Sequence, residues 1–192
     1  MIYFTSDHHF GDTRMELFYR NFNSTQKMNE CLRDEWNNVV SSEDTVYHLG
    51  DFAYTPEGLE WADQLNGRKI LIRGNYDDQF DDKTLLKYFD KVHKIKFVKI
   101  RGEIVQLNHY PEMSSETNFN LVGHIHSLWK VQRNQINCGC DAWHYRPVSL
   151  DTIVFTMNAI RKHYDQNVFS GELFSNIKYA SEKIKEELKD KL

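Results

Sequence analysis

The sequence lacks several features that would assign it to well-known classes of protein. No apolar run approaches the roughly 20 residues of a membrane-spanning helix, so we expect no membrane segment. The first ten residues, MIYFTSDHHF, contain no Lys or Arg, and Asp7 interrupts their apolar stretch, so we expect no signal peptide. A basic excess is also absent, because 24 Lys and Arg stand against 28 Asp and Glu, a net charge of −4. This balance argues against strong binding to duplex nucleic acid, although bound metal ions could still attract a nucleotide substrate.

Cysteine is scarce, and linker-like segments are missing. The three cysteines are Cys31, Cys138 and Cys140. An odd count without a signal peptide predicts a reducing compartment, so we expect a cytoplasmic protein without a disulfide framework. The chain has no internal repeat, no low-complexity run and no Pro/Gly/Ser-rich linker. Its 192 residues, 40% of them hydrophobic, therefore predict a single domain over 1–192 with a sizeable core.

What is present is an alternation of strand and helix patterns. Short runs rich in β-branched and aromatic residues predict strands at 2–6, 45–50 and 68–74. Amphipathic or capped segments between them predict helices at 24–40 and 56–67. Further elements are expected as a helix near 82–89, strands near 92–100, 103–109, 119–124 and 134–139, and helices at 149–164 and 171–192. The pattern predicts an α/β fold in which 171–192 is an appended helix, either a solvated face or a contact for a homo-oligomer.

Polar side chains gather where the predicted strands end, which is where α/β sheets bind ligands. These residues are Asp7, His9, Asp51, Asn75, His109, His124 and His126. Residues i and i+2 of an extended segment point the same way, so Asp7 and His9 are expected to converge while His8 points elsewhere. His124 and His126 are expected to converge in the same manner. Glycine precedes Asp51, Asn75 and His124, which fits a backbone packed close to a crowded centre.

The residue types in this set are those that bind divalent metals. Two carboxylates, one amide and four imidazoles are too many for one tetrahedral ion but suit two ions that share a bridging carboxylate. Nitrogen and oxygen donors without thiolate favour Mn²⁺, our first expectation, with Fe, Zn or Ni as alternatives. Two such ions about 3.5–4 Å apart can activate water and stabilise charge on a phosphoryl group.

The order of these motifs resembles the calcineurin-like metallophosphoesterase superfamily. The matching segments are SDHHF, LGDF, GNYD, LNHYP and GHIH, and DTVYHLGDFA and CDAWHYRPVSL are similar to small bacterial and phage members. The resemblance implies a four-layer α/β/β/α sandwich with a dinuclear site at its rim. It further implies the ligand sets, in which one metal would take Asp7, His9 and His126, the other Asn75, His109 and His124, and Asp51 would bridge them.

One position departs from the superfamily pattern. The superfamily usually has His after the Gly-Asn pair, thought to assist the leaving group or hold the phosphate, but this chain has Tyr76. Tyrosine, with an ordinary pKa near 10, is a poorer proton shuttle at neutral pH than imidazole. We therefore expect a preference for phosphodiesters or other substrates with better leaving groups, or the use of another acid, for which His8 and His144 are candidates. Asp77 either orients a ligand or Tyr76, or is simply an acid at a helix N-terminus.

Substrate recognition is less clearly encoded. Guanidinium candidates for phosphate are Arg14, Arg20, Arg73 and Arg146, His144 is a further polar candidate, and Tyr110 could stack on a base. A surface arginine or a core tyrosine is the ordinary alternative for most of these.

The sequence thus predicts a dinuclear-metal-dependent phosphoester hydrolase that acts on a small phosphoester or nucleotide, with Asp51 central to catalysis. A phosphodiesterase is favoured. The alternatives are a phosphomonoesterase or nucleotide phosphatase, and a non-catalytic scaffold, since this fold also serves as a subunit of a trafficking coat. A decayed site would not need all seven expected ligands, and all seven are present.

Overall fold

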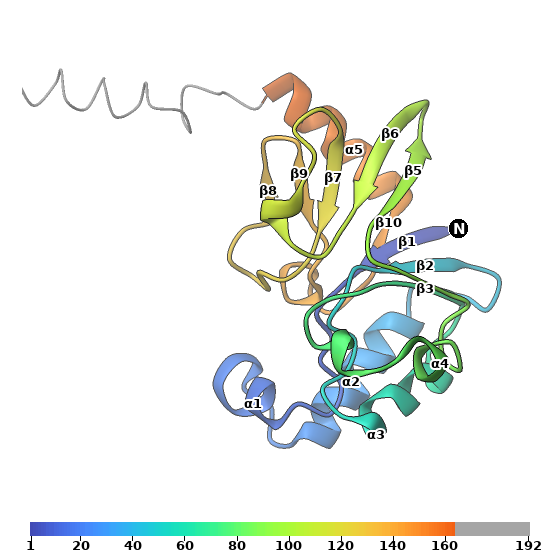
Figure 1. The fold of residues 1–192 in the computed structure, drawn as a ribbon. Helices are drawn as coiled ribbons and strands as arrows, with labels where there is room; N and C mark the ends of the chain where they lie inside the picture. The colour runs from blue at the N-terminus through green and yellow to red at the C-terminus, as the bar shows by residue number, and fades with distance from the viewer. Residues whose placement is uncertain (164–192) are drawn as a thin grey trace, which may run out of the picture.

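Two five-stranded sheets form the centre of the molecule (Figure 1). The computed structural model describes residues 1–163, apart from the side chains of residues 17, 18 and 163. The first sheet has the order β10-β1-β2-β3-β4, formed by Val148–Ser149, Ile2–Thr5, Thr45–His48, Arg68–Ile72 and Lys91–His93. The second has the order β5-β6-β7-β9-β8, formed by Lys96–Ile100, Glu103–Leu107, Phe119–Val122, Gln135–Asn137 and Val131–Gln132.

The first sheet places three loops at one edge. Strands β1 to β4 run parallel, with Thr5 opposite His48 and His48 opposite Leu71, while β10 pairs antiparallel with β1. The carboxyl ends of β1, β2 and β3 therefore lie side by side. In the second sheet β6, β7 and β9 are also parallel, so their carboxyl ends share an edge as well.

Helices cover the first sheet on the side away from the second. The longest is α2 (Thr25–Asn37), whose N-terminus is capped by Ser24. Its buried Leu32 and Trp36 share one hydrophobic cluster with Val46 and Leu71 of the sheet. Shorter helical segments are α1 (Thr13–Met15), η1 (Glu16–Arg20), α3 (Pro56–Leu59), η2 (Glu60–Gln64), η3 (Asp77–Gln79), α4 (Asp82–Leu85), η4 (Pro111–Met113) and η5 (Cys140–Trp143).

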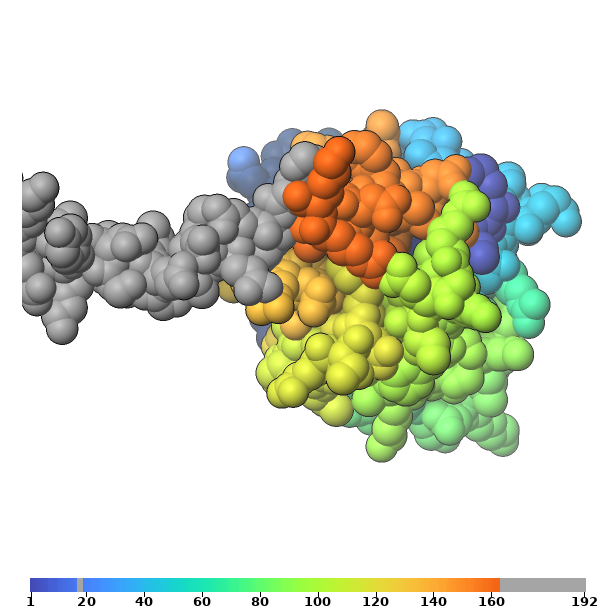
Figure 2. All heavy atoms as spheres, turned by 90° about the horizontal axis from the view of Figure 1, so that it is seen from above, coloured from blue at the N-terminus to red at the C-terminus, as the bar shows by residue number. Residues whose placement is uncertain are grey.

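A second cluster joins the two sheets. Phe4 and Ile70 of the first sheet share it with Leu107 and Leu121 of the second. Helix α5 (Leu150–His163) contributes apolar side chains to the same cluster and contacts β1, β9 and β10. Viewed from above, α5 (orange) lies beside the β5–β6 hairpin (green) (Figure 2). The two sheets and the helices packed on them confirm the expected α/β fold class.

Most predicted elements are present, although the strands are shorter than expected and the helix expected over 56–67 is one α-helical turn followed by a 3₁₀ turn. The single strand expected near 92–100 is wrong, because the chain passes there from β4 in one sheet to β5 in the other. The short β8, β10 and α1 were not expected, and the helix predicted over 171–192 lies outside the described residues. Within residues 1–163, no helix combines the length and apolar character that crossing a membrane requires.

Candidate metal centre

The predicted ligands lie at the shared edge of the strands, where backbone hydrogen bonds join the loops that follow β1 and β2. The Asp7 amide donates to the Gly50 carbonyl at 2.9 Å, and the His9 amide donates to the Asp51 carbonyl at 3.1 Å. These bonds extend the β1–β2 pairing beyond the strands. They bring the first two predicted motifs into contact, although 40 residues separate them in the chain.

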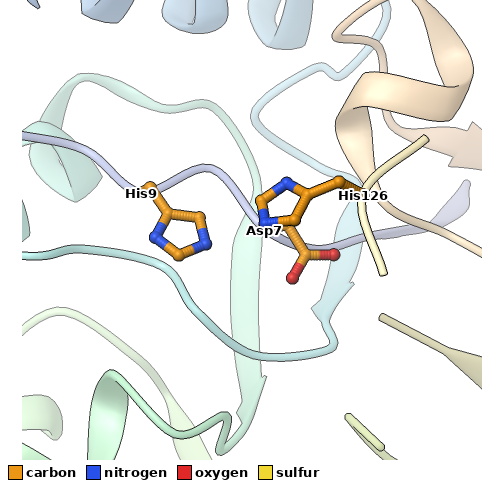
Figure 3. Close-up of side chains that lie close together, drawn as sticks. All are labelled: Asp7, His9 and His126. Carbon is orange, nitrogen blue, oxygen red and sulfur yellow. The ribbon is translucent and has the colours of Figure 1, made fainter. Parts of the chain in front are cut away.

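Two groups of side chains could each hold a cation. Asp7, His9 and His126 form the first, with potential ligand atoms within 4.8 Å of one another; Asp7 and His9 come from one segment and His126 from another (Figure 3). Asp51, His109 and His124 form the second group by the same measure.

Asp51 and Asn75 complete the arrangement. Asp51 Oδ2 lies 3.7 Å from His9 Nε2 and 3.2 Å from His109 Nε2, so this carboxylate stands between the two groups. Asn75 Oδ1 lies 3.3 Å from His109 Nε2 and so belongs with the second group. All seven predicted ligands are therefore brought together in the division that the resemblance implies.

The spacing argument was right for one pair and wrong for the other. Asp7 and His9 converge, but His124 and His126 belong to different groups, and Ile125 is only half-buried. None of these four residues is in extended backbone, so the i, i+2 argument applies to neither pair, and contacts with other segments decide which side chains meet. Positive φ angles occur at Asp7, His9, Asp51, His124 and His126, at 61°, 53°, 57°, 75° and 50° respectively.

Left-handed backbone at non-glycine residues is unfavourable, and it clusters here on five of the seven predicted ligands. Each such residue costs on the order of 1–3 kcal/mol, which the surrounding structure must offset. Strain of this kind concentrates at functional sites, so its placement supports this edge of the sheets as the functional one.

Two glycines permit the close approach of the loops, as expected. A Cβ at Gly74 would lie 2.3 Å from Asp51 Oδ1, and one at Gly50 would lie 2.5 Å from His109 Nδ1. Gly50 also has a φ of +98°. Any larger residue at either position would displace a predicted ligand.

The protonation states fit a cation site in the first group. Burial lowers the pKa of His9 to about 3, so this imidazole is neutral, as a metal ligand must be. Neither of its ring nitrogens makes a hydrogen bond, although both are buried. Burial also raises the pKa of Asp7, and a bound cation would favour its charged form. Unpartnered nitrogens beside a desolvated carboxylate are the donor set that a divalent metal would satisfy.

In the second group, the orientation of the ligands is set by their neighbours. His109 Nδ1 lies 2.7 Å from the Leu49 carbonyl oxygen and donates to it, which leaves Nε2 facing Asp51 and Asn75. Burial alone would lower the pKa of His109, but its hydrogen bond with Asp51 raises that pKa to about 9. The Asp51 pKa is correspondingly held below its usual value despite burial.

Asp77 holds the Asp51 loop and the Gly74 loop together. Its carboxylate accepts from the backbone amides of Asp51 and Gly74, both at 2.8 Å, and from that of Phe52 at 3.1 Å. The side chain is fully buried, and burial raises its pKa to about 7. Of the two interpretations offered by the sequence, the geometry fits an acid that orients the ligand loops.

Sequence reasoning missed Asp141, which accepts a 2.8 Å hydrogen bond from Nδ1 of His126. Arg20 in turn donates to both Asp141 oxygens, at 2.7 and 2.9 Å, and to the His8 carbonyl at 2.7 Å. Asp141 lies within the CDAWHYRPVSL segment, so the resemblance contained the signal without assigning the residue.

Three arginines expected to bind substrate are engaged elsewhere. The Arg20 side chain is 1% exposed and bonded as described, so its assignment to substrate binding is wrong. Arg73 donates to the carbonyls of Asp77 and Phe80, which makes it an anchor of that loop. Arg146 pairs with Glu35 of α2.

Neither histidine candidate for a general acid belongs to a ligand group. His8 is fully buried among aromatic rings, and its Nδ1 lies 3.0 Å from His48 Nε2, so it cannot reach a substrate and its expected acid role is wrong. His144 is exposed at the C-cap of η5, one residue after its end, and lies outside both ligand groups. Tyr110 does lie at the site, with its ring 4.9 Å from His109 and 5.0 Å from His124.

Tyr76 occupies the position of the missing histidine. Its amide donates to Asp51 Oδ1 at 2.9 Å, and its ring stands edge-on to His9 at 4.9 Å. Its hydroxyl accepts from Arg14 Nη2 at 3.2 Å. The Tyr76 ring therefore lies against the first group of ligands, and its hydroxyl accepts a hydrogen bond from the Arg14 guanidinium.

The fold and this site define a metallophosphoesterase. The family model for calcineurin-like phosphoesterases matches residues 1–138, so the chain belongs to that family. Members of the family typically bind divalent metals, and the two groups of ligands are the candidates for that binding here.

Three relatives extend over most of the chain. The protein MJ1445 of Methanocaldococcus jannaschii, described as uncharacterized, is 33% identical over 168 residues, 80% of this chain and 89% of its own. The gene 66 protein of Mycobacterium phage L5 is 28% identical, over 83% of this chain and 95% of its own. The crystal structure of AQ665 from Aquifex aeolicus, titled as a protein of unknown function, superposes with a TM-score of 0.65 at 27% identity, over 81% of this chain and 98% of that one.

Proposed function

We propose that this phosphoesterase is a phosphodiesterase that depends on two divalent metal ions, with Mn²⁺ as the first candidate. The observation that carries the proposal is the position of Asp51, whose Oδ2 lies between His9 of one ligand group and His109 of the other. A single ion would need neither two groups of three side chains nor a carboxylate between them.

The residues would divide the work in the following way. Asp7, His9 and His126 would hold one ion, Asn75, His109 and His124 the other, and Asp51 both. When bound, the pair of ions supplies an activated water and positive charge for the phosphoryl oxygens. Asp77 holds the Asp51 loop in place, and His109 is fixed in its tautomer by the Leu49 carbonyl.

What surrounds Tyr76 supports the part of the proposal that concerns the leaving group. Neither His8 nor His144 is placed to protonate a leaving group, and Tyr76 offers a phenol rather than an imidazole. Loss of general acid help costs most where the leaving group is a poor alkoxide. The site therefore favours substrates whose leaving group departs without a proton.

The test is hydrolysis of bis(p-nitrophenyl) phosphate and p-nitrophenyl phosphate by metal-free protein reconstituted with Mn²⁺. We expect the diester to be cleaved in preference to the monoester. Both substrates release p-nitrophenol, so the comparison measures only whether the enzyme prefers a phosphate with two ester groups or with one. Faster turnover of the monoester would favour a phosphomonoesterase.

Asp51→Asn keeps the shape of the side chain and removes its charge. We expect it to abolish metal-dependent hydrolysis of the diester, and unchanged activity would overturn the assigned role of Asp51. If neither substrate reacts while two ions still bind, the non-catalytic scaffold becomes the better account.

A further inference from the structure

A cavity of about 230 Å³ opens beside the first ligand group. Its walls come from His9, from Asp12, Arg14 and Met15, from Tyr19 of η1, from Tyr76, and from His126. It therefore adjoins the side chains proposed to hold one of the ions. A group bonded to the reacting phosphate could reach it directly.

Two of its walls are aromatic. The Tyr19 ring lies 5.0 Å from the His126 ring, and Tyr19 is 56% exposed. The Tyr76 ring stands against His9 at 4.9 Å. Met15 adds a buried thioether, another partner for aromatic groups. An exposed tyrosine face at the mouth of such a cavity is suited to stacking.

Arg14 gives the cavity a planar polar wall without net charge. Its Nε and Nη2 donate to the Asp12 carboxylate at 3.0 and 2.8 Å, and Nη2 also donates to the Tyr76 hydroxyl. The Arg14 guanidinium carbon lies 4.2 Å from the centre of the Tyr54 ring, and this contact holds the guanidinium in place. Nη1 makes no hydrogen bond within residues 1–163, which leaves one donor edge available.

These walls discriminate among the groups that could enter. A second phosphate gains little from Arg14, the one arginine among the wall residues, because Asp12 already neutralises its charge. An aliphatic chain would leave the Arg14 donor unsatisfied. A planar ring with polar edges can stack on Tyr19 and accept from Nη1. The cavity is smaller than the roughly 300–1,000 Å³ of drug-sized pockets, which suits one ring system.

We propose that this cavity binds the nucleobase of the substrate, so that the natural substrate is a nucleotide-containing phosphodiester. This inference rests on the proposed function, because it assumes that the phosphate is held at the neighbouring ligand groups. Tyr19 supplies the stacking face, and Arg14 a hydrogen bond to the edge of the base.

The test compares two ligands that differ only in the base. Binding of 5′-AMP and of ribose 5-phosphate to the Mn²⁺-loaded full chain would be measured by isothermal titration calorimetry. We expect 5′-AMP to bind about tenfold more tightly, in line with the stacking of one base on one aromatic side chain. Tyr19→Ala should remove most of this difference, while Tyr19→Phe should retain it.

A matched control is Phe155→Ala on α5, which truncates another exposed aromatic side chain away from the cavity. It should leave the ratio of the two affinities unchanged. Equal affinity of the wild-type protein for both ligands would overturn the inference, and so would a ratio that survives Tyr19→Ala. Diester hydrolysis by the same preparation reports on the proposed function separately, because the affinity ratio can be measured whether or not the diester is cleaved.

Discussion

The carboxylate of Asp141 accepts a 2.8 Å hydrogen bond from Nδ1 of His126, the ring that closes the first ligand group. This bond fixes the tautomer, so that Nε2 is the nitrogen available to a cation. Burial would lower the pKa of His126, but the bond to Asp141 raises it, and Arg20 on the far side holds Asp141 ionised.

The first prediction is that Asp141→Asn weakens metal binding at one site only. An amide cannot supply the charge that orients and polarises His126, and loss of such an outer partner typically costs about 10–100-fold in metal affinity. Equilibrium dialysis with Mn²⁺ should show one class of sites weakened and the other unchanged. Asp63→Asn, an exposed aspartate on η2, is the control. Equal weakening of both classes would contradict the assignment of His126 to one group.

The second prediction concerns Arg20, whose role here is structural. Arg20→Met leaves the Asp141 carboxylate buried without its cation, and breaking a buried pair costs on the order of 3–5 kcal/mol. Urea unfolding of the metal-free protein should report this loss. Arg146→Gln removes an exposed pair with Glu35 and should leave the unfolding midpoint nearly unchanged. If Arg20→Met is as stable as the wild type and instead raises KM, Arg20 contacts substrate after all.

The third prediction restores the histidine that the superfamily usually carries. Tyr76→His should raise turnover of glycerol phosphate relative to bis(p-nitrophenyl) phosphate, because an alkoxide gains most from a proton donor. A gain of roughly tenfold would be modest beside the 10²–10⁴-fold of general acid catalysis. Tyr76→Phe, which removes only the hydroxyl, should give no such gain. A collapse of diester hydrolysis in Tyr76→Phe would instead make the phenol the acid.

The fourth prediction separates His8 from the chemistry. His8→Phe keeps an aromatic ring in the core but leaves His48 Nε2 without its partner at 3.0 Å. The free energy of unfolding should fall by about 1–3 kcal/mol, the cost of an unsatisfied buried polar group. Turnover of the diester should fall by far less than the roughly 10²–10⁴-fold that removal of a general acid causes. A loss of that size in a stably folded variant with normal metal content would restore His8 as the acid.

The sequence predicted those features that depend on local pattern. The alternation of strand and helix patterns predicted the α/β fold, and the glycine positions predicted its crowded edge, where a Cβ at Gly74 would lie 2.6 Å from the Asp51 nitrogen. The motif order predicted which seven side chains meet. The split between β4 and β5 was missed, because residues 92–100, VHKIKFVKI, contain no Gly or Pro to mark the crossing between the sheets.

Other features depend on contacts that no local pattern encodes. Asp7 and His9 converge while His124 and His126 do not, although all four have left-handed backbone, so the i, i+2 rule for strands covers neither pair. Arg20 and Asp141 meet across 121 positions of the chain, so neither residue type alone reveals the pair. The same holds for Arg14 and Tyr76, which are 62 positions apart.

The most direct test of the central claim is a titration of metal-free protein with Mn²⁺, followed by both bound metal and hydrolysis of bis(p-nitrophenyl) phosphate. The account predicts that two ions bind per chain and that activity rises with the second ion, because Asp51 must serve both groups. Full activity at one bound ion, or two bound ions without any hydrolysis, would contradict it.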